Sequence, residues 1–265
     1  MPFAEINGLT LEYLRIAGAA NQPTLLMLHE GLGSVAMWRD FPQKLAAATA
    51  CSVFAYSRLG YGASEPLPAG DNEGRNVRKP DFMHVEAWET LPALRAALGL
   101  ENVVLFGHSD GGSIALLHAA RHAVEGVVVM APHVRVEKIS ITSIEAAKLA
   151  YETTDLRARL AKYHDDVDGA FRGWNDIWLA PEFRKWNIEA ELSKIKAPIL
   201  AMQGEKDEYG SMYQIEEIQR HIPGTRILKI PLCGHSPHRD QPEQVLALTQ
   251  SFLATQPQRA TDKAA

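Results

Sequence analysis

The residues of this chain that are best suited to chemistry lie in a serine motif flanked by glycines. Residues 107–111 read Gly-His-Ser-Asp-Gly, which places Ser109 at the centre of a G-x-S-x-G pattern. The pattern follows an apolar run, Val103 to Phe106, and precedes a helical pattern that begins near Gly112. Between a strand and a helix, such a serine sits on a sharp turn whose crowded backbone requires small neighbours. The motif predicts a nucleophilic serine; the alternative is an incidental serine in a glycine-rich turn.

A serine nucleophile needs a base, and histidine is the usual one. We expect His235 to be the base, because Gly234 and His235 lie in a loop after the last strand-like run. There the carboxyl edge of a parallel sheet faces a crevice. His238 is the runner-up because it shares that loop. The other histidines weighed as alternatives are His29, His108, His118 and His133.

The base in turn needs an acid that fixes its tautomer and orientation. Asp207 lies five residues after Met202, where another strand-like run ends, and it is flanked by Glu205 and Glu208. We favour Asp207 because of this distance and because of its short side chain. The order along the chain is then nucleophile, acid and base, which is the order expected when a G-x-S-x-G serine lies between a strand and a helix of a parallel sheet.

The oxyanion that forms on an attacked carbonyl needs two fixed hydrogen-bond donors. One is the backbone N–H of Asp110, which directly follows Ser109. The other should come from the loop after the strand-like run 24–28. Gly31 is favoured in that loop, because its amide can turn into the crevice without steric cost.

Buried strands must position these loops, and six apolar runs predict them. The runs lie at residues 24–28, 52–56, 102–106, 126–130, 198–202 and 225–230. A hairpin with Asn7-Gly8 at its turn precedes them. Helical patterns fall between most of the runs or after them, at residues 81–98, 112–122, 212–221 and 242–254. This alternation predicts an α/β fold, with a mostly parallel sheet covered by helices on both faces.

One long stretch interrupts the alternation. Residues 134–196 contain no strand-like run and are rich in helix formers and aromatic residues. Because the stretch lies between two predicted strands, we interpret it as a helical cap over the carboxyl edge of the sheet. The core domain would then consist of residues 1–133 and 197–256. Residues 257–265 are polar, and we expect a loose tail there.

Composition excludes several classes of protein. The chain has 265 residues, 46% of them hydrophobic and 22% charged, which suits one folded domain with an insertion. The chain contains no run of about 18 apolar residues, the length that would predict a membrane span. Its net charge of −5 argues against nucleic acid as a partner. The N-terminus lacks a secretory signal, and two cysteines, Cys51 and Cys233, suit neither a disulfide framework nor a zinc site. We expect a cytoplasmic protein without metal or organic cofactor, and the sequence predicts no oligomeric state.

Five motifs together resemble those of the α/β-hydrolase superfamily, over nearly the whole chain except the cap. They lie at residues 28–34, 57–64, 107–112, 204–207 and 234–237. Within the superfamily the chain is similar to the carboxylesterase, thioesterase and carbon–carbon bond hydrolase branch with a short helical lid. The resemblance implies an eight-stranded sheet, a cap between the sixth and seventh core strands, and a Ser-His-Asp triad. It carries the triad to Ser109, Asp207 and His235, and the oxyanion donors to Gly31 and Asp110.

One position departs from the pattern of the family. The family usually has His-Gly-X at the oxyanion loop, whereas this chain has His29-Glu30-Gly31. An unpaired carboxylate beside the anion site would oppose the developing negative charge. We therefore expect Glu30 either to turn away and pair with Arg58 in a neighbouring loop, or to be solvated.

Aromatic residues suggest where an acyl group would bind. We expect the substrate pocket to include two residues after the oxyanion loop and two of the cap: Met37, Trp38, Trp174 and Trp178. The cap also needs aromatic residues for its own packing, so these side chains have a competing role. Three basic cap residues either meet a carboxylate or a coenzyme A phosphate or form a solvated face: Arg157, Arg159 and Lys162.

These residues predict a serine hydrolase that acts on a small-molecule ester or thioester with a small apolar acyl group. The reaction would pass through an acyl-enzyme on Ser109, with no metal. The nearest alternative is a carbon–carbon bond hydrolase or a lyase on the same triad. A non-catalytic ligand receptor on this fold is a second alternative, and metal-dependent hydrolysis is disfavoured because clustered ligands are lacking.

Overall fold

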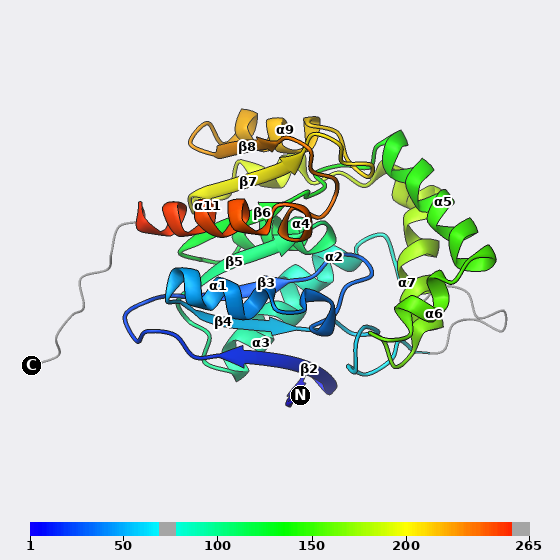
Figure 1. Cartoon of the computed structure of the whole chain (residues 1–265), viewed down its shortest axis with the longest axis horizontal. Helices are drawn as coiled ribbons and strands as arrows, with labels where there is room; N and C mark the ends of the chain where they lie inside the picture. Colours follow the sequence, from blue (N-terminus) through cyan, green and yellow to red (C-terminus); the bar gives the residue numbers. More distant parts are fainter. Residues whose placement is uncertain (69–77, 256–265) are drawn as a thin grey trace, which may run out of the picture.

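Eight strands form one sheet in the computed structural model of the chain, which describes residues 1–68 and 78–255 (Figure 1). The strands are β1 Phe3–Ile6, β2 Leu9–Ile16, β3 Thr24–Leu28, β4 Ser52–Tyr56, β5 Val103–His108, β6 Gly126–Met130, β7 Ile199–Gly204 and β8 Arg226–Ile230. Their order is β1-β2-β4-β3-β5-β6-β7-β8. Only β1 with β2 and β2 with β4 pair antiparallel among these strands, so the predicted mostly parallel sheet is confirmed.

The central strands are apolar because they are covered on both sides. All six residues of β5 are buried, as expected for a parallel strand between two layers of helices. Leu28 at the end of β3 is in register with Tyr56 of β4 and Gly107 of β5. The carboxyl ends of the parallel strands therefore lie along one edge, which brings the loops that follow them together.

Alternate residues of each strand face two separate core layers. Leu25 and Met27 of β3 pack in one layer, with residues of α1 and α11, whereas Leu26 and Leu28 pack in the other, with residues of α3, α4 and α9. The helices of the core are α1 Phe41–Thr49, α2 Phe82–Val85, α3 Leu91–Ala97, α4 Asp110–Ala119, α9 Tyr213–His221, α10 Pro237–Asp240 and α11 Pro242–Ala254, with a 3-10 turn, η1, at Ala36–Trp38. Figure 1 shows α1 and α11 on one face of the sheet.

Two predicted helices differ in detail from the structure. The helix expected at residues 81–98 consists of α2, a π-helical turn at Glu86–Thr90 and α3. Pro92 follows the π turn and cannot donate an N–H to the preceding turn, which accounts for the irregular bonding there. The helix expected near Gly112 begins two residues earlier, at Asp110, directly after the serine.

Four α-helices and a 3-10 turn, η3, lie between β6 and β7, and they make up most of the 134–196 segment. They are α5 Lys138–Thr153, α6 Leu156–Leu160, α7 Val167–Leu179, η3 Pro181–Lys185 and α8 Glu189–Leu192. Figure 1 shows α5, α6 and α7 together at one end of the sheet. His164 joins this segment to two core loops, since its Nδ1 accepts from the N–H of Gly62 and its Nε2 donates to the carbonyl of Leu32, both at 3.0 Å.

The division into a core and a cap stays a prediction, and the expected tail at residues 257–265 lies outside the described residues. Within the described part of the chain, no helix combines the length and the apolar character needed to cross a membrane.

Removing a leucine side chain should destabilise the fold more when the leucine lies in a core layer than when it is exposed. Leu105 of β5 is completely buried, whereas Leu149 of α5 is 61% exposed. We expect Leu105→Ala to lower the free energy of unfolding by about 2–5 kcal/mol, because it removes packed methyl groups and leaves a cavity. Leu149→Ala, the matched control, should change it by less than about 0.5 kcal/mol. Urea denaturation measures both, and equal losses would contradict the assignment of β5 to the core.

Candidate active site

Ser109 lies on a strained turn between β5 and α4. Its φ is 52° and its ψ is −120°, a conformation that non-glycine residues rarely adopt. A Cβ on Gly107 would overlap the carbonyl oxygen of Gly111, and a Cβ on Gly111 would overlap the carbonyl oxygen of Leu28. Only glycine fits at these two positions, so the turn holds the backbone that Ser109 needs and presses it against the end of β3.

The structure brings Ser109, His235 and Asp207 together from three separate loops. The Nε2 atom of His235 lies 2.9 Å from the Oγ atom of Ser109, and its Nδ1 atom lies 2.8 Å from Oδ1 of Asp207. Since the carboxylate can only accept, Nδ1 carries the proton and Nε2 accepts from the serine hydroxyl. Among the histidines and acids considered from the sequence, His235 and Asp207 are the ones that are hydrogen-bonded in series with Ser109.

The carboxylate of Asp207 is fixed by donors that the sequence analysis did not identify. Gln203 is the next-to-last residue of β7, and its Nε2 donates to Oδ2 of Asp207 at 2.7 Å. The backbone N–H groups of Tyr209 and Gly210 donate to Oδ1 at 2.8 and 3.2 Å. Burial alone would raise the pKa of Asp207, but the hydrogen bond to His235, its charge and the Tyr209 N–H keep that pKa below its ordinary value.

His235 is tuned by the same contacts. Burial disfavours its charged form, yet the hydrogen bond and the charge of Asp207 outweigh burial and raise the pKa of His235 above its ordinary value. Glu208, one of the alternative acids, contributes to this rise, and its Oε2 accepts from the backbone N–H of His235 at 3.3 Å. The ring can therefore hold a proton that it takes from the serine.

A second histidine, His108, contacts the main chain of His235. The Nε2 atom of His108 donates to the carbonyl oxygen of His235 at 2.7 Å. Its Nδ1 atom lies 3.5 Å from Oε2 of Glu30, and Nη2 of Arg239 lies 3.4 Å from Oε1 of the same carboxylate. Burial would raise the pKa of Glu30, but these two neighbours hold it well below its usual range. Glu30 is thus a paired anion.

The expected ion pair between Glu30 and Arg58 is wrong. The buried guanidinium of Arg58 donates to the main-chain carbonyl oxygens of His29 and of Glu30, the latter at 2.9 Å. The backbone N–H of Arg58 donates to Nε2 of His29 at 3.0 Å. The carbonyls of the oxyanion loop point toward Arg58, whereas the carboxylate of Glu30 points to His108 and Arg239. Arg58 therefore holds the loop through its backbone.

Asp110 belongs to the serine turn itself, and the loop that contains Gly31 begins beside that turn. Asp110 is the first residue of α4, where backbone N–H groups have no partner within the helix. The contact of Gly111 with Leu28 places the loop that contains Gly31 beside this helix end. Trp174 of α7 covers Gly31 so closely that a Cβ there would overlap its indole ring. The 134–196 segment therefore touches the oxyanion loop directly.

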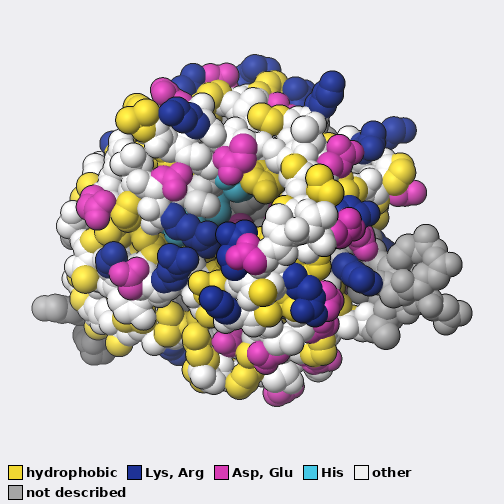
Figure 2. All heavy atoms as spheres, turned by 45° about the vertical axis from the view of Figure 1, so that its right-hand side comes forward, with side chains coloured by type: hydrophobic (Ala, Val, Ile, Leu, Met, Phe, Trp, Pro, Cys, Tyr) yellow, Lys and Arg dark blue, Asp and Glu magenta, His cyan; other side chains and the backbone are white. Residues whose placement is uncertain are grey.

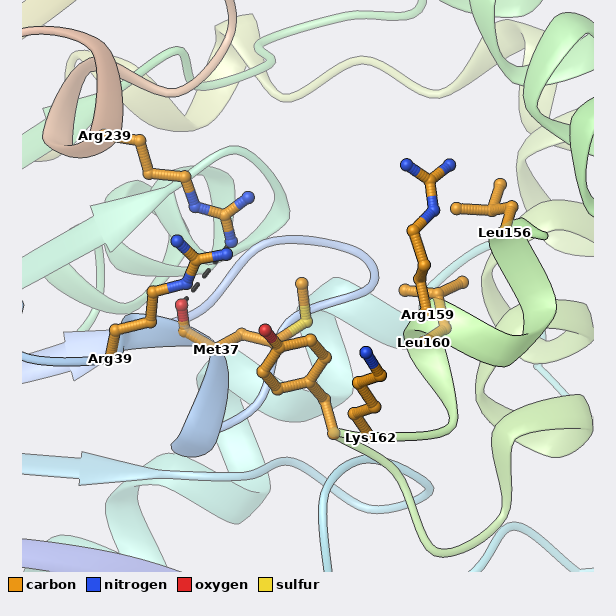
Figure 3. Close-up of a pocket in the computed structure, with 8 residues that line it drawn as sticks. Met37, Arg39, Leu156, Arg159, Leu160, Lys162 and Arg239 are labelled. Atoms are coloured by element: carbon orange, nitrogen blue, oxygen red, sulfur yellow. Dashed lines mark hydrogen bonds between the residues drawn. The ribbon is translucent and has the colours of Figure 1, made fainter.

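The four residues expected in a substrate pocket lie in different surroundings. Trp38 is buried in the core behind the oxyanion loop, with its ring centroid 4.8 Å from that of His238. Trp178 is buried edge-on against His133, with ring centroids 4.9 Å apart. Trp174 covers Gly31, and Met37 lines a surface pocket beside the loop (Figure 3). Their role in binding an acyl group stays a prediction.

Asp110 carries a buried carboxyl group that the sequence gave no reason to expect. The residue is 1% exposed, and neither carboxyl oxygen has a hydrogen bond of ordinary geometry to the described residues. Burial raises the pKa of Asp110 to about 6, although the charges of Arg58 and Arg78 favour the ionised form. Such a group costs stability next to the candidate nucleophile.

Metal ligands do not gather at this site or elsewhere in residues 1–68 and 78–255. No group of three or more His, Cys, Asp or Glu side chains in those ranges could hold a metal ion. The imidazole of His235 instead contacts Asp207 and Ser109.

The chain matches known proteins over most of its length. The profile of a family described as the alpha/beta hydrolase family matches residues 25–248. The chain is 29% identical to the carboxylesterase YbfK of Bacillus subtilis (strain 168), over 89% of this chain and 82% of that protein. It is 25% identical to the sn-1-specific diacylglycerol lipase ABHD11 of Mus musculus, over 95% of this chain and 87% of that protein. The crystal structure of the enol-lactonase from Burkholderia xenovorans LB400 superposes with a TM-score of 0.73 at 22% identity, over 96% of this chain and all of that one.

The buried carboxyl of Asp110 predicts a stability gain that depends on pH. Because its pKa is raised to about 6, ionisation opposes folding above the ordinary pKa of 3.8, and the full cost is reached above pH 6. We expect Asp110→Asn to raise the free energy of unfolding at pH 8 by about 1–3 kcal/mol. The gain should shrink as the pH is lowered toward 4.

Urea denaturation at pH 5 and pH 8 measures this dependence. Asp165→Asn, at an exposed position, is the matched control and should show no pH-dependent gain. A gain for Asp110→Asn that is equal at both pH values would contradict the proposed cost of ionisation.

Proposed function

Since the chain belongs to the alpha/beta hydrolase family, we propose that it is a serine hydrolase that cleaves a carboxylic ester or thioester through an acyl-enzyme on Ser109. The observation that carries this proposal is the hydrogen-bonded path from Asp207 through His235 to the hydroxyl of Ser109. The similarity to a carboxylesterase and a diacylglycerol lipase supports ester chemistry.

In the first half of the reaction, the Oγ atom of Ser109 attacks the substrate carbonyl while Nε2 of His235 takes its proton. The imidazolium that forms faces the carboxylate of Asp207 at 2.8 Å, which stabilises it. The negative charge on the carbonyl oxygen is met by the backbone N–H groups of Gly31 and Asp110. The positive end of the α4 dipole adds to this stabilisation.

The tetrahedral intermediate then collapses. The bond to the alcohol or thiol breaks, and His235 returns its proton to that leaving group. A water molecule, deprotonated by the same nitrogen, attacks the acyl-enzyme, and the second tetrahedral intermediate releases the carboxylic acid and restores the hydroxyl of Ser109. Each proton that His235 accepts is returned within the same half-reaction, so no cofactor is needed.

The acyl group would lie under the 134–196 segment, which acts as a cap in this proposal. Trp174 and Trp178 of α7, with Met37 of η1, would bound an apolar acyl pocket, whereas Trp38 would support the oxyanion loop from the core. The contact between Trp174 and Gly31 supports this placement, because it puts an aromatic surface directly beside an expected oxyanion donor. Excluding water there would strengthen the hydrogen bonds to the oxyanion.

Covalent labelling tests the role of Ser109. We expect a fluorophosphonate probe to label the native protein at one site and to fail with Ser109→Ala, because the probe reacts only with an activated serine. Ser193→Ala, at an exposed serine after α8, is the control and should be labelled fully. Undiminished labelling of a folded Ser109→Ala protein would reject Ser109, and no labelling of the native protein would favour a non-catalytic receptor.

The pH dependence of ester hydrolysis tests His235 and Asp207. Because only the neutral ring can act as the base and its pKa is raised, kcat/KM for p-nitrophenyl butyrate should rise with pH through a midpoint above about 6.5. Asp207→Asn should lower kcat by roughly 10³–10⁴-fold. It should also move the midpoint to lower pH, since burial then dominates.

Glu208→Gln is the matched control for that experiment. It removes a nearby carboxylate that contributes less to the raised pKa of His235, so the midpoint should shift down by less and most of the activity should stay. An equal loss of activity in both variants would argue against Asp207 as the acid that orients the base.

A further inference from the structure

A basic pocket opens beside the candidate active site. It encloses about 390 Å³, and four of its eight lining side chains are Lys or Arg: Arg39, Arg159, Lys162 and Arg239. No Asp or Glu belongs to the residues that line it within the described part of the chain. The remaining lining side chains are apolar or aromatic, among them Met37 and Tyr163.

The wall of this pocket is shared with the machinery around Ser109. Arg239 belongs to α10, which directly follows the loop of His235. Its Nη2 atom lies 3.4 Å from Oε1 of Glu30 and 3.5 Å from the carbonyl oxygen of Met37, both in or after the oxyanion loop. Figure 2 shows a hollow on this face, with histidine side chains inside it and Lys and Arg side chains along its edge. A substrate bound at Ser109 could extend into the basic pocket.

The cations of the pocket come from opposite sides. Arg39 and Arg239 are contributed by the core, whereas Arg159 and Lys162 belong to the 134–196 segment. Figure 3 shows the guanidinium of Arg159 across the pocket from those of Arg39 and Arg239. A solvated face would spread its charges outward along one helix, but these charges converge on one space, where they repel one another.

Acidic partners only partly neutralise this cluster. Arg239 has Glu30, and Arg159 has Asp155 at 3.2 Å on its own helix. Neither Arg39 nor Lys162 forms an ion pair with any described residue. The excess of positive charge is local, since the whole chain has a net charge of −5.

The backbone at Arg39 is also unusual. Its φ is 54° and its ψ is −124°, nearly the conformation of Ser109, and a non-glycine residue in this region costs of order 1–3 kcal/mol. The strained residue follows η1 and directs the chain so that its side chain lines the pocket. Strain of this kind is typical of functional sites.

From these observations we propose that the basic pocket binds an anionic group, phosphate or carboxylate, on the part of the substrate that extends out of the active site. The inference rests on the proposed hydrolase function and narrows its substrates to anionic esters or thioesters. Guanidinium groups pair with both kinds of oxyanion through two parallel hydrogen bonds, and several converging cations favour the doubly charged phosphate.

Two matched pairs of substrates test the proposal. Butyryl coenzyme A and the butyryl thioester of N-acetylcysteamine have the same acyl group and the same type of thiol, but only the first carries phosphates. Monomethyl succinate and methyl butyrate form the corresponding pair for a carboxylate. We expect the native protein to have the higher kcat/KM for the anionic member of at least one pair.

Arg39→Gln combined with Lys162→Gln should lower that anionic-to-neutral ratio of kcat/KM by about tenfold, the effect of about 1.4 kcal/mol of lost charge-assisted binding. Arg15→Gln, at an exposed position of β2 on the opposite edge of the sheet, is the matched single-charge control and should leave the ratio unchanged. A fall for the coenzyme A pair identifies phosphate, and a fall for the succinate pair identifies carboxylate. Equal ratios for native and double-variant protein in both pairs would overturn the proposal.

A binding measurement separates this inference from the proposed reaction. Calorimetry with Ser109→Ala protein and either coenzyme A or succinate should detect binding that the Arg39→Gln, Lys162→Gln changes weaken by about tenfold. This result would support the anion pocket even if no ester were hydrolysed and Ser109 proved unreactive. Absence of binding of both probes at millimolar concentration, together with unchanged ratios, would reject it while leaving the serine hydrolase intact.

Discussion

The close approach of Gly111 to the carbonyl oxygen of Leu28 is the constraint on which the rest of the site depends. It presses the start of α4 against the end of β3, and together with Gly107 it leaves Ser109 only a positive φ. Strain of this kind, of order 1–3 kcal/mol, persists only where the surrounding structure enforces it. Here the enforcing structure is the middle of the parallel sheet, whose strands end in register at this edge. Ser109, the first turn of α4 and the start of the loop after β3 are therefore fixed by one packing contact.

Much of this arrangement could be predicted from the sequence, because parallel strands deliver their following loops to a common edge. Apolar runs located the strands, and the loops after β7 and β8 offered Asp207 and His235, which the structure places in hydrogen-bond contact with each other and with Ser109. The directions of individual groups could not be predicted. Whether Arg58 meets a carboxylate or a carbonyl depends on how a loop backbone turns, and the pattern of residue types does not record it. The support from Gln203 was missed for the same reason. The expectations of a cytoplasmic location, of no cofactor and of no nucleic-acid partner rest on the sequence alone and stay predictions.

Two carboxyl groups beside the serine turn, those of Glu30 and Asp110, have pKa values shifted in opposite directions. The carboxylate of Glu30 faces His108 and Arg239, and these neighbours hold its pKa well below the usual range. The carboxyl oxygens of Asp110 have no hydrogen bond of ordinary geometry to the described residues, and burial raises the pKa of Asp110 to about 6 despite the charges of Arg58 and Arg78. A protein selected for stability alone would not keep an unpaired carboxyl group in its interior, because the cost is of order 1–3 kcal/mol. Its place directly after Ser109 is consistent with the general finding that such costs are tolerated at functional sites.

Glu30, the residue that departs from the family pattern, also contacts two parts of the site, His108 and Arg239. One of its carboxylate oxygens faces His108, whose other ring nitrogen donates to the carbonyl of His235. The second oxygen faces Arg239 at the wall of the basic pocket. A glycine at position 30, as the family usually has, could make neither contact. Arg239 and the buried His108 would then each lose the carboxylate that they face in the described part of the chain. The carboxylate of Glu30 thus links the loop of His235, through His108, to Arg239 at the wall of the basic pocket.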